Sequence, residues 1–288
     1  MGDGFAVLGG RSVAEHTDEV QRQIRARPQD ASLRLALCHF LAVRGEWQRA
    51  DDQRQRAMQL DPNFTPAAST YAMALAGERH RSEFWAGGRP PAIPAGQAEW
   101  VDQLISAAAL PTDQALQAAA LRDSARQAAP AVGGALQLVD RSDTRPDQTV
   151  DDEPVERVDF AWLCDGDARI GAVLELFTPS GYAWLPLPAV LRVKLPRPRH
   201  LADLIWIAAE IELRDGRALN GLVPVRYPSA LQALDDAAAL GRRTDWDALP
   251  GDDQYAGVGQ RILTSDAGDH AFLDIRTIEF ETAERAPA

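Results

Sequence analysis

Hydrophobic residues in the first 130 positions recur at the three- to four-residue spacing of amphipathic helices. One such stretch ends at Arg27-Pro28, since proline disfavours helix in the residue before it. A second helix is expected after Asp30, a residue type that caps helix N-termini, and a third over Trp47–Leu60. The first half of the chain is therefore predicted to be entirely helical.

Small residues and prolines in this half share a fixed spacing. Two alanines and a proline recur 68 positions apart, twice 34, in two sets: Ala50, Ala57 and Pro62, then Ala118, Ala125 and Pro130. A 34-residue period with small residues in the second helix is typical of tetratricopeptide (TPR) repeats. The copy between them is degraded, with Phe84 and Gly96 at the alanine and proline positions. The pattern favours a TPR-like array; a generic helical bundle with coincident prolines is the alternative.

Beyond residue 158 the period changes to the alternation typical of strands. Runs rich in Val, Ile, Leu and aromatic residues predict strands at 170–177, 182–187, 190–195, 205–213, 261–263 and 272–280. Asp215-Gly216 is a strong hairpin signal. One helix is expected over 229–240, ending at Gly241.

These patterns predict an α+β protein of two domains. An all-helical TPR-like domain is expected over residues 1–130 and an α+β domain with a mainly antiparallel, curved sheet over 159–282. Residues 131–158 are polar, acidic and contain prolines, so they are predicted to form a linker, much of it mobile.

The net negative charge of the chain makes some classes of binding partner unfavourable. The 288 residues carry a net charge of −12, of which −10 lies in residues 151–288. Such a surface repels phosphate backbones and anionic lipids, so neither nucleic acid nor a membrane is expected as a partner. The two cysteines lie far apart, and neither a signal peptide nor a membrane-spanning apolar stretch is recognisable, so we expect a cytoplasmic protein.

Signatures of catalysis are sparse. The sequence contains neither G-x-S-x-G nor a P-loop motif, and its histidines and cysteines form no metal-binding pattern. Asp165-Gly-Asp167 would hold a divalent cation through two carboxylates, although the same tripeptide is common in hairpin turns. We therefore expect no cofactor, metal or enzyme activity, with a metal-dependent enzyme that uses Asp165 and Asp167 as the alternative.

Arginines and aromatic residues cluster in three segments of the second half: Arg226-Tyr227, Arg242-Arg243-Thr-Asp-Trp246 and Gln260-Arg261. Such residues anchor partners at interfaces, or they form internal ion pairs that hold loops on a sheet. We favour the structural role for Arg226, Arg243 and Arg261. The candidate acceptors are Asp245, Asp266 and Asp274.

The order of motifs across residues 158–280 resembles the ImpE family, also called SciE or TagJ. The motifs that carry the resemblance include Phe160-Ala-Trp162-Leu-Cys-Asp165-Gly-Asp167, Gly181-Tyr-Ala-Trp184, Val223-Pro-Val-Arg226-Tyr227-Pro, Arg242-Arg243-Thr-Asp245-Trp246 and Gly257-Val-Gly-Gln260-Arg261. The resemblance implies a non-enzymatic accessory protein of bacterial type VI secretion.

The resemblance also implies partners. Members of the family act as adaptors, and some bind the N-terminal helix of the small contractile-sheath subunit, TssB, and influence its handling by the ClpV disassembly ATPase. We therefore expect a TssB-like subunit as partner and ClpV as a further one. No catalytic residues come with the family.

A TPR array presents a concave surface on which an amphipathic partner helix can dock. In the best repeat, the positions that line such a surface carry small and apolar residues: Ser32, Leu35, His39, Ala42 and Val43. This strip is the predicted docking surface. The alternative is that its residues pack against the neighbouring repeat.

Overall fold

The computed structural model describes residues 10–139, 155–228 and 231–282. The polar part of the predicted linker, residues 140–154, lies outside the described residues, so its expected mobility stays a prediction. Within the described part, no helix is both long and apolar enough to cross a membrane.

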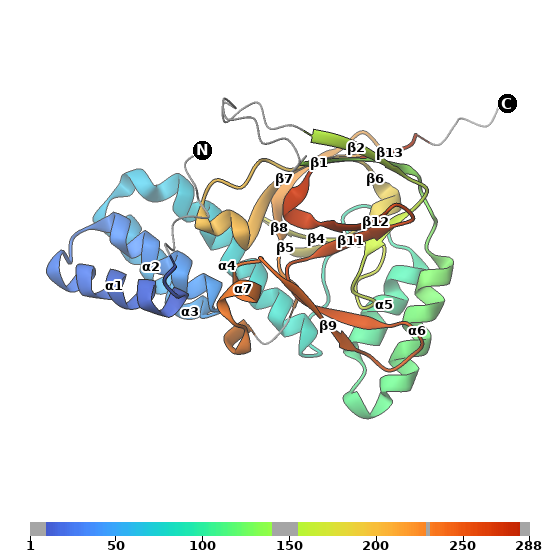
Figure 1. Cartoon of the computed structure of the whole chain (residues 1–288), viewed down its shortest axis with the longest axis horizontal. Helices are drawn as coiled ribbons and strands as arrows, with labels where there is room; N and C mark the ends of the chain where they lie inside the picture. Colours follow the sequence, from blue (N-terminus) through green and yellow to red (C-terminus); the bar gives the residue numbers. More distant parts are fainter. Residues whose placement is uncertain (1–9, 140–154, 229–230, 283–288) are drawn as a thin grey trace.

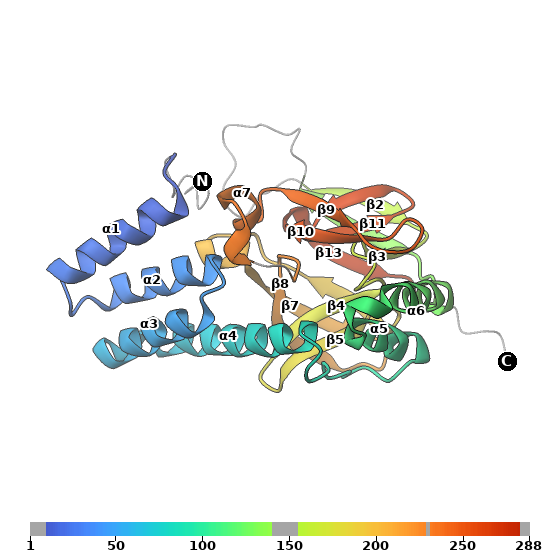
Figure 2. The same ribbon diagram turned by 90° about the horizontal axis from the view of Figure 1, so that it is seen from below.

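The chain begins with four helices stacked in layers (Figures 1 and 2). They are α1 (Val13–Ala26), α2 (Ala31–Val43), α3 (Trp47–Leu60) and α4 (Thr65–Trp85). As predicted, the Asp30 carboxylate caps α2 by accepting from the backbone N–H groups of Ser32 and Leu33. Ala50 and Ala57 of α3 are fully buried, which lets α3 pack closely against α2.

Helix α4 connects the helical half to the sheet. It has 21 residues and packs on α3 along one part and on strands β4 (Val173–Thr178) and β5 (Gly181–Pro186) along another. At Gly77 the helix backbone touches the Phe177 ring so closely that a Cβ atom would lie 2.4 Å from it. The absence of a side chain at this position sets how near α4 lies to the sheet.

The helices do not continue as one array after α4. The chain runs through a non-helical segment in which Ala92 pairs with Ala183 of the edge strand β5. It then forms a hairpin of α5 (Glu99–Ala109) and α6 (Ala115–Ala128), which lies at the opposite end of the sheet half from α1–α3 (Figure 2). The degraded middle repeat of the sequence therefore corresponds to a real interruption.

A mainly antiparallel sheet follows, as predicted. Its eight strands have the order β2-β1-β13-β6-β7-β8-β4-β5, and the pairs along it are antiparallel. The remaining strands of this sheet are β1 (Gly134–Val139), β2 (Val155–Phe160), β6 (Val190–Lys194), β7 (Trp206–Leu213), β8 (Ala218–Pro224) and β13 (Ile275–Phe280).

Two smaller sheets pack beside the large one. One pairs β9 (Thr244–Ala248) with β10 (Tyr255–Gly259). The other has the order β12-β11-β3, formed by β3 (Leu163–Asp165), β11 (Ile262–Ser265) and β12 (Gly268–Ala271). The sequence does not predict the β9–β10 pair, because its aspartates and glycines are typical of a loop.

Two further segments differ from the sequence prediction. Strand β1 and most of β2 lie inside residues 131–158, so the predicted linker contributes two strands to the large sheet. Of the helix expected over 229–240, residues 229–230 lie outside the described residues, and the rest forms the 3-10 turn η6 (Leu231–Ala233) and the short helix α7 (Asp236–Ala239), which the Asp235 side chain caps at the backbone N–H of Ala238. The division of the chain near residue 130 stays a prediction.

We expect Gly77→Ala to destabilise the protein. At an exposed helix position this change stabilises by about 1 kcal/mol, because alanine is the better helix former. Here the added methyl meets the Phe177 ring, and overpacking costs roughly 1–3 kcal/mol. Urea unfolding of both proteins measures the difference, and a more stable variant would contradict the close approach of α4 to the sheet.

Candidate functional site

The predicted docking strip on α2 is partly covered by the chain itself. Ser32 is exposed and Leu35 and His39 are half-buried, but Ala42 and Val43 are fully buried. The 3-10 turn η5 (Leu201–Leu204) also packs against α2. The strip is therefore accessible to a partner only toward the N-terminal end of the helix.

His39, in the middle of the strip, packs inside the helical layer. Its ring meets the Tyr71 ring of α4 edge-on, with 4.6 Å between centroids. Burial lowers the pKa of His39 to about 4, so the imidazole is neutral at pH 7. Its Nε2 atom is buried and has no hydrogen-bond partner among the described residues. This geometry favours the packing role for His39 over partner binding.

Arg226 fastens the end of α2 to the sheet half. The side chain is 2% exposed, and its guanidinium donates to the carbonyl oxygens of Val43 at 2.6 Å, Ala239 at 2.8 Å and Ala42 at 3.3 Å. Val43 and Ala239 end α2 and α7, where carbonyls lack partners within the helix and the dipole favours a cation. Burial lowers the pKa of Arg226 to about 10, which still leaves it charged at pH 7.

Glu175 of β4 is the centre of a buried charge network. Its carboxylate accepts two hydrogen bonds from Arg81 of α4, at 2.8 and 2.6 Å, and further ones from Arg261 and the Tyr182 hydroxyl. Arg261 also donates to Asp165 at 2.7 Å. Arg81 also pairs with buried Glu78 of its own helix at 3.6 Å, so two guanidiniums and three carboxylates lie together in the interior.

The pKa values of Glu175 and Asp165 shift in opposite directions. Burial alone raises the pKa of Glu175, but Arg81 and Arg261 outweigh it and lower that pKa to about 2. For Asp165 burial prevails over the attraction of Arg261 and raises the pKa to about 7. Glu175 contacts two arginines, whereas Asp165 contacts one and also lies beside the like-charged Asp167.

The Asp165-Gly-Asp167 segment does not form an open cation site. Asp165 accepts from Arg261 and from the Asp167 backbone N–H, and Asp167 is held by the Arg169 guanidinium at 2.5 Å and by the Gly257 N–H at 3.0 Å. The described residues contain no group of three or more His, Cys, Asp or Glu side chains that could hold a metal ion. Both carboxylates act as internal ion-pair partners rather than as part of an exposed turn.

The predicted acceptors of the arginine clusters are partly wrong. Arg261 pairs with Asp165 and Glu175 rather than with Asp266 or Asp274. The Asp266 carboxylate accepts instead from the backbone N–H of Ala161 at 2.7 Å. The acceptors of Arg261 come from strands 96 and 86 positions away in the sequence, which a search of the neighbouring motifs does not reach.

Arg243 is not buried, contrary to the expectation that it pins a loop from inside. It forms exposed ion pairs with Asp235 and Asp245, both at 2.8 Å. Arg242 is exposed, and Trp246 on β9 is 39% exposed. The structure thus separates the clusters into buried Arg226 and Arg261 and an exposed group around Arg243.

Tyr227 and Gln260 hold the segments between these arginines. The Tyr227 hydroxyl donates to the carbonyl oxygen of Ile262 at 3.1 Å and accepts from its N–H at 2.9 Å. The Gln260 side chain accepts from the backbone N–H of Leu273 at 3.1 Å. Both side chains are therefore committed to internal contacts.

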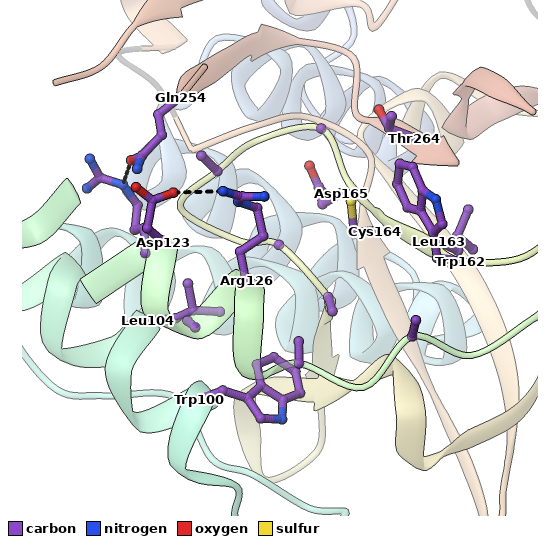
Figure 3. A pocket seen from close by; sticks show the side chains of 18 of the residues that line it. Trp100, Leu104, Asp123, Arg126, Trp162, Leu163, Cys164, Asp165, Gln254 and Thr264 are labelled. Carbon is purple, nitrogen blue, oxygen red and sulfur yellow. Dashed lines mark hydrogen bonds and ion pairs between the residues drawn. The ribbon is translucent and has the colours of Figure 1, made fainter. Parts of the chain in front are cut away.

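A pocket of about 490 Å³ opens between the α5–α6 hairpin and the β3 segment (Figure 3). Its walls are mostly apolar and include Trp100, Leu104, Ala125, Trp162 and Leu163. The sequence does not predict this pocket, because its walls come from segments far apart in the chain that only the fold brings together. The buried alanines of α6 were the one signal that a close contact exists there.

The sequence of this chain matches a known protein family and a curated relative. Residues 157–279 match the family model "ImpE protein". Over 268 residues the chain is 38% identical to the type VI secretion system accessory component TagJ of Pseudomonas aeruginosa, covering 92% of this chain and 86% of that protein. The chain belongs to the ImpE family.

The fold of this ImpE-family chain is also found in a crystal structure. VPA1032 of Vibrio parahaemolyticus aligns with a TM-score of 0.80 over 97% of both chains, at 22% identity, which shows the shared fold alone. The family model includes Asp165, Glu175, Arg226 and Arg261, whereas Arg81 comes from the helices before it. The ImpE domain and the helices therefore share one buried network.

We expect Arg226→Ala to destabilise this ImpE-family protein by about 3 kcal/mol, because it leaves helix-terminal carbonyls without their charged donor. The thermal midpoint should fall by roughly 6–12 °C. Arg243→Ala is the matched control, since its ion pairs are exposed, and it should melt like the parent. Equal melting of the parent and the Arg226 variant would contradict the structural role.

Glu175→Gln should cost about 3–5 kcal/mol at pH 7, because it breaks a buried ion pair on two arginines. The folded-state pKa of Glu175 lies below its ordinary value of 4.5, so its contribution is present above pH 4.5 and is lost as the pH falls toward 2. The variant should therefore lose less stability than the parent over that range. Urea unfolding at several pH values measures the free energy of unfolding, with the exposed Glu210→Gln on β7 as control. If the variant lost as much stability as the parent between pH 4.5 and 2, the network would be contradicted.

Proposed function

We propose that this ImpE-family chain is a non-enzymatic adaptor of a bacterial type VI secretion system. It binds the N-terminal helix of the small contractile-sheath subunit, a TssB-like protein. The observation that carries the proposal is the 38% identity to the accessory component TagJ over 92% of the chain. A match of this length includes the helices as well as the ImpE domain, so the inference rests on both.

The chemistry of the interior supports an adaptor over the metal-dependent alternative. The three buried carboxylates of the ImpE domain, Asp165, Asp167 and Glu175, are all engaged by arginines. An enzyme of the alternative class needs carboxylate oxygens free for a cation. The residues that suggested catalysis therefore have a sufficient structural role.

The acidic character of the chain fits a protein partner in the cytoplasm. A net charge of −12 opposes binding to nucleic acid and to anionic membrane surfaces. In the proposed role the adaptor holds the sheath subunit through its first helix and thereby influences how the ClpV ATPase handles the sheath. Direct contact with ClpV is the secondary part of the proposal.

Co-purification with the small sheath subunit tests the proposal. The intact subunit should be captured by this chain, and a subunit lacking its first helix should be captured at least about tenfold less, a difference of about 1.4 kcal/mol. Equal capture of both forms would contradict binding through the helix. Capture of neither would contradict the sheath subunit as partner.

A further inference from the structure

Arg122 of α6 is a buried cation without an anionic partner. It lines the pocket between α6 and β3 and is 8% exposed. Its guanidinium donates to two neutral acceptors, the Gln254 side-chain oxygen at 2.6 Å and the Pro250 carbonyl at 3.1 Å. No carboxylate among the described residues forms an ion pair with it. Burial lowers the pKa of Arg122, and the more distant carboxylates of Asp167 and Asp123 offset this effect only in part.

The carboxylates around the pocket have other direct partners, so they stabilise the charge of Arg122 only from a distance. Arg126 pairs with Asp123 at 3.1 Å, and both are drawn in Figure 3. Asp165 pairs with Arg261 at 2.7 Å. Asp253 lies exposed at the rim and has no ion pair with Arg122 within the described part of the chain. An arriving carboxylate would therefore meet an arginine that is already held in place.

The rim of the pocket has the character of a protein interface. Trp162 lines the pocket and is 38% exposed. Trp246 is exposed to a similar extent, and its ring lies against Gly166 in the pocket wall. Tryptophan and arginine are the residues most enriched at the energetic centres of protein interfaces. Two exposed tryptophans beside an apolar pocket favour a protein segment over a small metabolite.

We propose that this pocket, rather than the strip on α2, anchors the partner helix. A large apolar side chain of an amphipathic helix enters the space between Trp100, Leu104 and Trp162. A carboxylate one turn away on the same helix pairs with Arg122, since residues three or four apart share a helix face. The inference rests on the proposed function for the identity of the partner, and it adds the site and the chemistry that the partner needs.

The experiment measures binding of the purified small sheath subunit by isothermal titration calorimetry. Ala131→Trp fills the pocket mouth from an exposed position, so it leaves the core intact. Arg122→Gln removes the unpaired charge. Each should weaken binding at least about tenfold. Arg157→Gln, which removes an exposed arginine on β2, is the matched charge control and should bind within about twofold of the parent.

The results distinguish a wrong binding site from a wrong proposed function. Unweakened binding by Ala131→Trp overturns the inference and leaves the proposed function in place. Loss of binding in Leu35→Asp alone locates the helix on α2 and also overturns it. If Arg122→Gln melts as a folded protein and binds normally, the pairing with a carboxylate is wrong. If the parent itself does not bind, the proposed function fails and the inference fails with it.

Discussion

The Glu175 carboxylate is the interaction on which the arrangement of the two halves depends. It lies on β4, in the interior, and is held by Arg81 from α4 and by Arg261 from the segment before β11. Taking these charges out of water is expensive, so the cluster persists only because each member has a partner in the right geometry. An orientation of α4 that displaced Arg81 would leave Glu175 short of a cation. The network thereby selects one placement of the helices on the sheet.

The same constraint brings parts of the sheet half against the helices and covers the C-terminal end of the predicted docking strip on α2. With α4 fixed on the sheet, Glu78 of that helix also accepts from the Trp206 indole at 2.9 Å, and Arg226 reaches the end of α2. The 3-10 turn η5 then fills space beside α2 that an isolated array would present to a ligand. A surface that closes on its own chain cannot also be fully open to a partner. The α5–α6 hairpin is separated from that array, and its contact with the ImpE domain leaves the apolar pocket.

Local patterns predicted local structure well and long-range partners poorly. The Asp30 cap, the helices of the first half and most strands follow from spacing over a few residues. The partners of Arg81 and Arg226 lie 94 and 183 positions away, so no local pattern could indicate them. Strand β1 was missed because six residues beside an acidic segment look like linker until β13 and β2 pair with them. Arg243 was misassigned because charge in a loop does not reveal burial.

A raised pKa in a buried carboxylate often marks an active site, and Asp165 at about 7 meets that description. Here the partner geometry supplies a simpler cause, because Arg261 is shared between Asp165 and Glu175. Glu175 has a second arginine and ionises readily, whereas Asp165 has one shared cation and bears more of the cost of burial. Buried arginines elsewhere in the described structure are compensated by a carboxylate or by helix-terminal carbonyls, as at Arg54, Arg81, Arg226 and Arg261. Arg122 differs from these four, because its direct acceptors are the Gln254 side chain and the Pro250 carbonyl and the carboxylates of Asp123 and Asp167 act on it only from a distance.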